Sequence, residues 1–354
     1  MRSWLAWARV ALVIVASMML GSAGSALAQP RAAAAVKPAP DKPWSVSRTP
    51  WGDPDLQEIW STEDLRDIPY ERPDEFAGRA SLSDEEFAAR RAQAERASIR
   101  AQTGFANASK TRTFRLTSLI ADGDGKYPRL TPSAIQRFRI TDIGTYGEGP
   151  FLGPEDFNLY DRCITRGVVG SLLPVAYGNG LQIFQTKSAV IIQYEMVHET
   201  RVIPLDGRPH VGSRIRMYMG DPRGHWDGNT LVVETTNFTA RTSVGRNGYG
   251  PHHSPALRLV ERFTRVSKEQ IDYQVLVDDP ETWTRPFTMA FPLTTHQGYQ
   301  LFPYECHEGN LMLVQALSGA RAEDQVEAEA LKSGRPPRAR TPVWEAPEGV
   351  QVPR

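Results

Sequence analysis

The chain has only two cysteines and no net charge, and both features limit what it can be. Its 41 basic and 41 acidic side chains cancel, so the net charge suggests neither a nucleic-acid partner nor a membrane-surface role. With Cys163 and Cys306 alone, a single intramolecular disulfide is the one possible pairing. The hydrophobic fraction of 40% and the eight tryptophans are nevertheless enough for a real core, which argues against a wholly disordered chain.

Several signatures of catalysis and metal binding are missing. The sequence has no Gly-rich phosphate loop of the Rossmann or Walker type, no G-x-S-x-G elbow and no internal repeat of fixed period. Its seven histidines form no His-x-His or His-Glu-x-x-His pattern, so we predict neither a metal nor a cofactor. A three-ligand site drawn from His198, His210 and His307 is the geometric alternative.

The first 28 residues are typical of a secretory signal peptide. Two arginines precede an apolar run from Val10 to Leu20, and small residues ending in Ala28 follow it. The run is shorter than the ~20 residues that a helix needs to cross a bilayer, and an N-terminal anchor is the alternative. We therefore expect cleavage before Gln29 and a periplasmic or secreted mature protein, with no membrane span after cleavage.

Export would place the two cysteines in an oxidising compartment, where disulfides persist. We predict a bridge between Cys163 and Cys306 that closes a loop of roughly 143 residues and contributes about 4 to 5 kcal/mol in the chain-entropy model. The alternative is a nucleophilic Cys306 activated by His307. Adjacent side chains of an extended strand point to opposite faces, so His307 is badly placed to act as that base.

Composition divides the rest of the chain. Residues 29–50 and 326–354 are poor in apolar side chains and are predicted to be a flexible tether and a disordered tail. Residues 51–170 are predicted to form a helical or irregular extension that packs on the main domain. Its clearest helix signal is SLSDEEFAARRAQAERASIRA, which begins with a good N-cap.

From residue 171 to residue 325 the apolar period changes to two, which predicts strands. Asp206-Gly207 and Asp221-Pro222-Arg223-Gly224 have the composition of turns between them. Short connections imply an antiparallel meander, so we expect a mainly β domain, a barrel or a sandwich that is lipocalin-like by analogy alone. The predicted strands are LQIFQT, AVIIQYEMVHETRVI, SRIRMYMG, NTLVVETTNF, ALRLVERFTRV, QIDYQVLVDD, TWTRPFTMAFPL and LMLVQAL, and PDLQEIW could supply another.

Several long phrases resemble those of a widespread family of secreted bacterial proteins that are mostly carried as hypothetical. The phrases are DRCITRGVVGSLLP, VIPLDGRPH, GDPRGHWDGNTLVVETTNFT, RLVERFTRV, DPETWTRPF and YECHEGN. The resemblance covers roughly residues 51 to 322. It implies a common fold and an exported location, and it brings no assigned reaction.

Strand parity turns three titratable side chains toward apolar neighbours. They are His198 in AVIIQYEMVHETRVI, Glu234 in TLVVETTNF and Glu261 in ALRLVERFTRV. If the strands are neighbours, the three could converge in one cavity, although a period of two fixes faces and not register. His198 is either a hydrogen-bonded core residue or a ligand-facing one. Glu261 is either a paired structural carboxylate or a general acid or base, because burial disfavours its charged form.

A second set of candidates lies in the predicted loops, where functional residues concentrate when a rigid scaffold holds them. Arg208, His210, Asp221 and Trp226 are predicted to form a site at the rim of the β domain. The alternative is a structural network of Asp and Arg side chains within the turns. The remaining candidates for ligand contact are Trp283, His307 and Glu308.

Together these features favour an exported protein that acts on a small molecule. The mixture of His, carboxylate, Arg and Trp side chains suits a polar aromatic or sugar-like ligand. In its enzymatic form, a metal-independent lyase, isomerase or hydrolase, His198 or His210 would be the base and Glu261 the acid. The alternatives are a lipocalin-like carrier without activity and an envelope-associated interaction protein.

Overall fold

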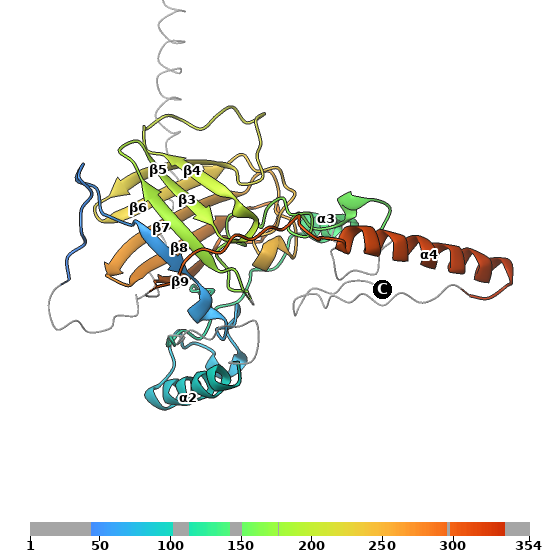
Figure 1. The fold of residues 1–354 in the computed structure, drawn as a ribbon, viewed down its shortest axis with the longest axis horizontal. Coiled ribbons are helices and arrows are strands. Elements are labelled where there is room, and N and C mark those ends of the chain that lie inside the picture. The colour runs from blue at the N-terminus through green and yellow to red at the C-terminus, as the bar shows by residue number, and fades with distance from the viewer. Residues whose placement is uncertain (1–43, 102–112, 142–150, 176, 296–297, 337–354) are drawn as a thin grey trace, which may run out of the picture. The chain divides into compact units, whose positions relative to one another are not determined.

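The computed structural model describes residues 44–101, 113–141, 151–175, 177–295 and 298–336. The predicted signal peptide, most of the predicted tether and the end of the predicted tail therefore lie outside the described residues. Within the described ranges the chain is mainly β, as the strand periodicity predicts (Figure 1).

Nine strands form one antiparallel sheet with the order β4-β3-β2-β1-β9-β8-β7-β6-β5. Neighbours in the sheet are mostly neighbours in the chain, which confirms the predicted meander. No hydrogen-bonded ladder joins the two edge strands, β4 and β5, so the sheet is not closed into a barrel. The strands are β1 Glu58–Ser61, β2 Gly180–Gln185, β3 Ala189–Tyr194, β4 Thr200–Pro204, β5 Asp221–Asp227, β6 Thr230–Thr236, β7 Arg258–Ser267, β8 Gln270–Asp278 and β9 Phe287–Thr294.

β1 comes from the predicted extension and lies in the middle of the sheet. It pairs with β2 along its whole length but with β9 only through Ser61 and Thr294. Further along β9, the amide of Ala290 donates to the carbonyl of Leu119, and the amide of Ala121 donates to Thr288, each at 2.9 Å. The segment around Leu119 thus pairs with the part of β9 that β1 does not reach.

Among the described residues, three α-helices and several short 3-10 turns accompany the sheet. The helices are α2 Asp84–Ala101, α3 Pro132–Thr141 and α4 Met312–Lys332, and the 3-10 turns are η1 Glu63–Leu65, η2 Asp74–Phe76, η3 Pro154–Asp156, η4 Met196–His198 and η5 Arg246–Gly248. The start of α2 has a reciprocal cap, because the Ser83 hydroxyl accepts from the amide of Glu86 and the Glu86 carboxylate accepts from the amide of Ser83. The helix predicted from SLSDEEFAARRAQAERASIRA is confirmed.

The two edge strands approach each other through side chains. A β-carbon added at Gly224 of β5 would lie 2.8 Å from the side chains of both Ile203 and Leu205, at the end of β4. Only a glycine leaves room for this contact. The sheet therefore curls until its edge strands β4 and β5 are in side-chain contact, although no backbone hydrogen bonds join these two strands.

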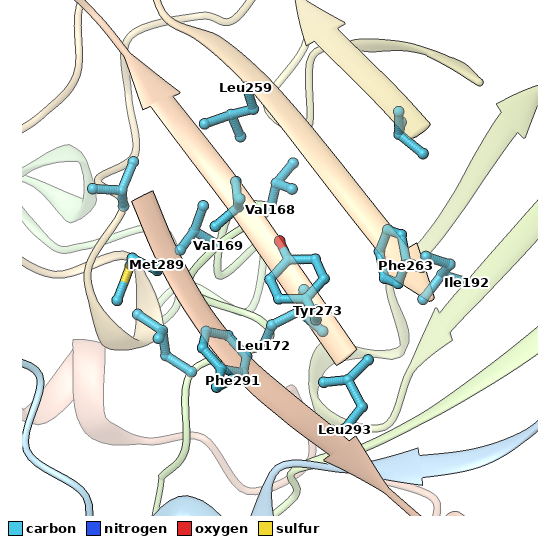
Figure 2. Close-up of a cluster of buried hydrophobic side chains, with 14 of the residues drawn as sticks. Val168, Val169, Leu172, Ile192, Leu259, Phe263, Tyr273, Met289, Phe291 and Leu293 are labelled. Atoms are coloured by element: carbon cyan, nitrogen blue, oxygen red, sulfur yellow. The ribbon is translucent and has the colours of Figure 1, made fainter. Parts of the chain in front are cut away.

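The space inside the curled sheet is filled with side chains. Val168, Val169 and Leu172, from the segment before β2, belong to the same buried cluster as Met289 and Phe291 of β9. Figure 2 shows these side chains together beside the strands. Burying each such side chain stabilises the fold by roughly 1.5–3 kcal/mol. The volume that a lipocalin-like carrier would keep for its ligand is occupied here by the chain itself.

The prediction that AVIIQYEMVHETRVI forms one long strand is wrong. The segment forms two strands, β3 and β4, separated by η4, in which Val197 and His198 have φ angles of 67° and 54°. An extended ladder cannot pass through left-handed residues, so the chain reverses there. The reversal also resets the parity: Arg201 is buried and Val202 is exposed, opposite to the prediction.

Three further local predictions are wrong. LMLVQAL was predicted to be a strand but begins helix α4. A short apolar run can be either helix or strand, and the strong helix formers that follow this one favour the helix. SRIRMYMG forms only an isolated bridge at Met217. Asp221-Pro222-Arg223-Gly224 is part of strand β5, whose place at the sheet edge accommodates Pro222.

Candidate functional site

An open pocket of about 350 Å³ lies beside the disulfide. Its wall combines two short segments that are far apart in the sequence, one before Cys163 and one around Cys306. The lining residues are Tyr160, Asp161, Tyr304, Glu305, Cys306, Glu308, Gly309, Asn310 and Met312. We call this the disulfide pocket.

The predicted bridge between Cys163 and Cys306 is confirmed, with the two Cα atoms 5.6 Å apart. Both cysteines are therefore oxidised, which excludes the interpretation of Cys306 as a thiolate nucleophile in this state. Asn310 adds a second link, because its amide donates to the carbonyl of Asp161 at 3.2 Å. These contacts hold the two walls of the pocket together.

The segment that leads into Cys306 is fixed from the sheet side by Glu195. This buried carboxylate accepts a hydrogen bond from the Tyr299 hydroxyl at 2.7 Å and another from the amide of Phe302 at 3.0 Å. It also accepts from the amide of Gly180 at 2.9 Å. Hydrogen bonds to a charged acceptor are among the strong ones, so the segment has a defined path to the pocket.

Asp161 is the most unusual group in the pocket wall. Asp161 is only 8% exposed to solvent. The Tyr249 hydroxyl donates to Oδ1 at 2.8 Å, whereas the buried Oδ2 has no hydrogen-bond partner among the described residues. Burial raises the pKa of this carboxyl to about 6, and the Tyr249 bond opposes the shift only in part. The carboxyl can therefore gain or lose a proton near neutral pH.

Tyrosine rings form the aromatic part of the pocket. Tyr304 lies 6.1 Å from Tyr177 between ring centroids, and Tyr160 lies 6.4 Å edge-on from Tyr249. Burial first, and then hydrogen bonding with Tyr304, raises the pKa of Tyr160. Its hydroxyl is thus neutral at physiological pH and can donate or accept a hydrogen bond.

Two more ionisable side chains lie close to the segment that follows Cys163. Arg166 belongs to this segment, and Glu199 contacts it through Thr165. Arg166 is 1% exposed, and its Nε donates to the side-chain oxygen of Asn247 at 2.8 Å. Burial lowers its pKa to about 10, which still leaves it charged at pH 7. Glu199 accepts a hydrogen bond from Thr165, and burial raises its pKa to about 7.

Left-handed backbone gathers in the segments around the pocket. Cys163, Val197, His198 and Asn247 are four of the non-glycine residues with positive φ in the described part of the chain. Val197 is the most costly of them, since a β-branched side chain rarely adopts this conformation. Such strain clusters at binding and catalytic sites, where surrounding contacts hold it in place.

His198 lies next to the disulfide pocket rather than inside the sheet. Its Nε2 is 3.7 Å from a carboxylate oxygen of Glu305, which lines the pocket, and its side chain is 41% exposed. Glu308 lines the pocket as well, and His307 is exposed beside it. Three of the predicted site residues, His198, His307 and Glu308, therefore lie at or beside the disulfide pocket.

Glu261 occupies a different environment. It is fully buried, accepts from Arg201 Nη1 at 2.9 Å and from the Tyr273 hydroxyl at 3.1 Å, and forms an ion pair with Arg201. Burial opposes the charge on Arg201, but the adjacent carboxylate outweighs it and raises the Arg201 pKa. Of the two alternatives for Glu261, the geometry favours the paired structural carboxylate.

The predicted convergence of His198, Glu234 and Glu261 does not occur. In the β6–β7 ladder Glu261 pairs with Val233, whereas Glu234 pairs with Val260, which places the two carboxylates on opposite faces of the sheet. Glu234 accepts a hydrogen bond from Arg258 at 2.7 Å on the outer face, and this bond lowers its pKa.

The predicted rim group is only partly assembled. His210 Nδ1 lies 3.1 Å from Asp221 Oδ2, so these two do meet. Asp221 is also 2.7 Å from Arg223 and accepts from the amide of Val211, which satisfies both of its oxygens. Arg208 pairs with Asp206 instead. The arrangement matches the alternative of a structural Asp and Arg network in the turns.

The two candidate tryptophans lie in or against the hydrophobic core. Trp283 is 4% exposed and packs edge-on against Phe287 at 5.3 Å. Trp226 packs against the core cluster, and its buried indole nitrogen has no partner within the described ranges. Neither ring lines the disulfide pocket.

The histidines do not assemble a metal centre in the described residues. Within the described ranges, no three His, Cys, Asp or Glu side chains are grouped so that they could hold an ion. His253, for example, is buried between the Thr242 hydroxyl at 2.8 Å and the Ser254 carbonyl at 3.0 Å, and burial lowers its pKa to about 4. It is a core residue satisfied by its neighbours.

No protein-family model, curated protein or solved structure matches this chain. The resemblance of its long phrases to a family of secreted bacterial proteins therefore stays a prediction. In the part of the chain that the structure describes, no helix has both the length and the apolar character needed to cross a membrane.

Sequence reasoning missed Asp161, Tyr160, Tyr304 and Glu305 as site residues. The signal that could have found them was present, since each lies within three positions of a cysteine. A predicted disulfide also predicts that the neighbours of its two cysteines meet. The phrases DRCITRG and YECHEGN therefore pointed to one site rather than to two.

Proposed function

We propose that this chain is an exported protein that binds a small polar organic molecule in the disulfide pocket. The enzymatic form of the proposal is metal-independent acid–base catalysis, of the lyase, isomerase or hydrolase type, in which the pocket residues move a proton at the bound molecule. The disulfide supports the exported location, because such bridges persist in oxidising compartments.

The single observation that carries the proposal is the state of Asp161. A buried carboxyl oxygen without a partner is rare in folded proteins, and it costs about 1–3 kcal/mol or more in unmet hydrogen bonding. Asp161 has such an oxygen, belongs to the wall of an open pocket and has a pKa of about 6. Since that oxygen is covered by the pocket wall, a bound ligand with a donor group would satisfy it by displacing the atoms that cover it.

The geometry also supplies a second proton-transfer group. His198 lies at the edge of the pocket through its contact with Glu305, and an imidazole side chain can accept or donate a proton. A carboxyl and an imidazole on one pocket can act as acid and base on the same ligand. In this proposal Asp161 takes the role that the sequence assigned to Glu261.

Asp161→Asn is expected to weaken ligand binding about tenfold or more, because the amide cannot carry the charge that a buried carboxylate uses in its strongest hydrogen bonds. A library of small polar compounds, screened by ligand-observed NMR on the disulfide-intact protein, would supply the ligands. Their dissociation constants would then be compared between wild type and Asp161→Asn.

His210→Ala is the matched control, because it removes the best-placed ionisable group of the rim. It should leave the dissociation constants unchanged. Ligands whose binding depends on His210 and not on Asp161 would move the site to the rim and refute the proposal for the disulfide pocket.

A second candidate function is favoured by helix α4. No residue of Met312–Lys332 is buried, and Val314, Val326 and Leu331 are each more than half exposed. Exposed apolar side chains on a long helix are typical of surfaces that contact a partner. An envelope-associated interaction protein would give no small-molecule ligand whose affinity depends on Asp161, so the same screen separates the two candidates.

A further inference from the structure

We propose that the ligand of the disulfide pocket is an organic cation, such as a protonated amine attached to an aromatic ring. This inference rests on the proposed function and names the chemical class of its ligand. It depends on three features of the pocket: the sign of its charges, the unmet bonding of Asp161 and the tyrosine rings in the wall.

The ionisable side chains that line the pocket are carboxylates and tyrosines. Asp161, Glu305 and Glu308 supply the acidic groups, and none of the described lining residues is a lysine or an arginine. Of the basic side chains nearest to the lining, His198 lies at the edge of the pocket, 3.7 Å from Glu305, and the two arginines have partners outside the pocket. Arg162 lies 3.9 Å from Glu155, and Arg166 donates to Asn247 and to the carbonyl of Leu173. The pocket therefore presents a negative surface to a ligand.

Asp161 is the acidic group that most needs a cation. A carboxylate removed from water is costly unless an opposite charge or several donors compensate it. The Tyr249 hydroxyl provides one neutral donor, and Asp161 forms no salt bridge with any residue of the described ranges. An ammonium group that displaces the wall atoms covering Oδ2 would supply both the charge and the N–H donor that this oxygen lacks.

The tyrosines favour the same class of ligand. Tyr160 and Tyr304 both line the pocket, and the faces of aromatic rings attract cations through their quadrupoles. They can also stack on an aromatic part of the ligand. An anionic ligand would instead meet three carboxylates without a lining cation to balance it.

The test uses three probes of one shape and different charge: benzylamine, benzyl alcohol and benzoate. Each is titrated into the full-length mature protein at pH 7.5, and binding is followed by calorimetry and by the methyl resonance of Met312, which lines the pocket. Benzylamine should bind at least about tenfold more tightly than benzyl alcohol, and benzoate should not bind measurably. Asp161→Asn should remove the preference for the amine.

Asp227→Asn is the matched control, because Asp227 forms an exposed pair with Arg262 away from the lining residues. It should leave the preference intact. The Met312 signal, assigned with Met312→Leu, reports the site in the wild-type protein even if Asp161→Asn folds poorly.

The outcomes separate the two proposals. Equal or tighter binding of benzyl alcohol or benzoate, with a Met312 shift, would overturn the cationic ligand and leave a small-molecule pocket. No Met312 shift with any of the three probes would count against the pocket as a binding site and against the cationic ligand together.

Discussion

Replacing Arg201 with methionine is expected to lower the free energy of unfolding by about 3–5 kcal/mol. The substitution keeps much of the side-chain volume but removes the charge that faces Glu261. Glu261 is fully buried and forms its ion pair with Arg201, so it would be left as an uncompensated carboxylate in the core. Thr235, which accepts a hydrogen bond from Arg201 at 2.6 Å, would lose that donor as well.

Urea unfolding followed by tryptophan fluorescence measures the effect. Arg262→Met is the matched control, since Arg262 follows Glu261 in β7, points to the opposite face and forms an exposed pair with Asp227 at 2.8 Å. Exposed pairs contribute about 1 kcal/mol at most, so the control should change little. The double variant Arg201→Met with Glu261→Leu should recover much of the loss, because no buried charge remains. A loss for Arg201→Met no larger than for Arg262→Met would show that the pair is not buried as described.

Removing the disulfide is expected to have an effect of similar size. Cys163→Ala with Cys306→Ala should lower the free energy of unfolding by about 4 to 5 kcal/mol, the value that the chain-entropy model gives for a loop of this length. The two cysteines are 143 positions apart, so the bridge restricts a large part of the unfolded chain. It also joins the two walls of the disulfide pocket, and ligand binding should weaken with it.

The same measurement on reduced wild-type protein is the control. If the bridge itself is responsible, the reduced protein and the double alanine variant should have equal stability within about 1 kcal/mol, which is within the usual range of a single substitution. Stability of the double variant within the same margin of the oxidised protein would contradict the prediction, because it would mean that the noncovalent contacts around Asn310 already hold the two segments.

The regular part of the fold could be predicted from the sequence. Strict alternation in 258–278 predicted β7 and β8, and the structure places every second residue of both strands in the core. The cysteine count predicted the single disulfide. Both predictions depend on local chemistry, a period of two or the absence of any other pairing, and so they needed no knowledge of distant contacts.

The failures have distinct physical causes. Two left-handed residues at Val197 and His198 changed the parity of everything after them, and no composition rule marks a valine for that conformation. The insertion of β1 between β2 and β9 is a long-range event that alternation cannot reveal. Val168, Val169 and Leu172 are buried inside the sheet and fill the space where a ligand cavity was expected.

The location of the candidate site could have been predicted from the disulfide. Cys163 and Cys306 were predicted to meet, and the consequence for Asp161, Tyr160 and Tyr304 follows directly from that prediction. What could not be inferred is the burial of Asp161 Oδ2 and its missing partner, because these depend on how the Tyr249 segment packs against the pocket wall.

The central claim is that Asp161 is a buried carboxyl without a cation, and a titration of that group tests it most directly. Carbon-13 NMR of aspartate carboxyls, with Asp161→Asn to assign the resonance, gives its pKa in the folded protein. The account predicts a midpoint at about pH 6. Because the folded-state pKa is raised above the ordinary value, ionisation of Asp161 should also reduce stability as the pH rises through 6. A midpoint at or below pH 4 would mean that Asp161 is well solvated or paired, and that would contradict the account of the pocket.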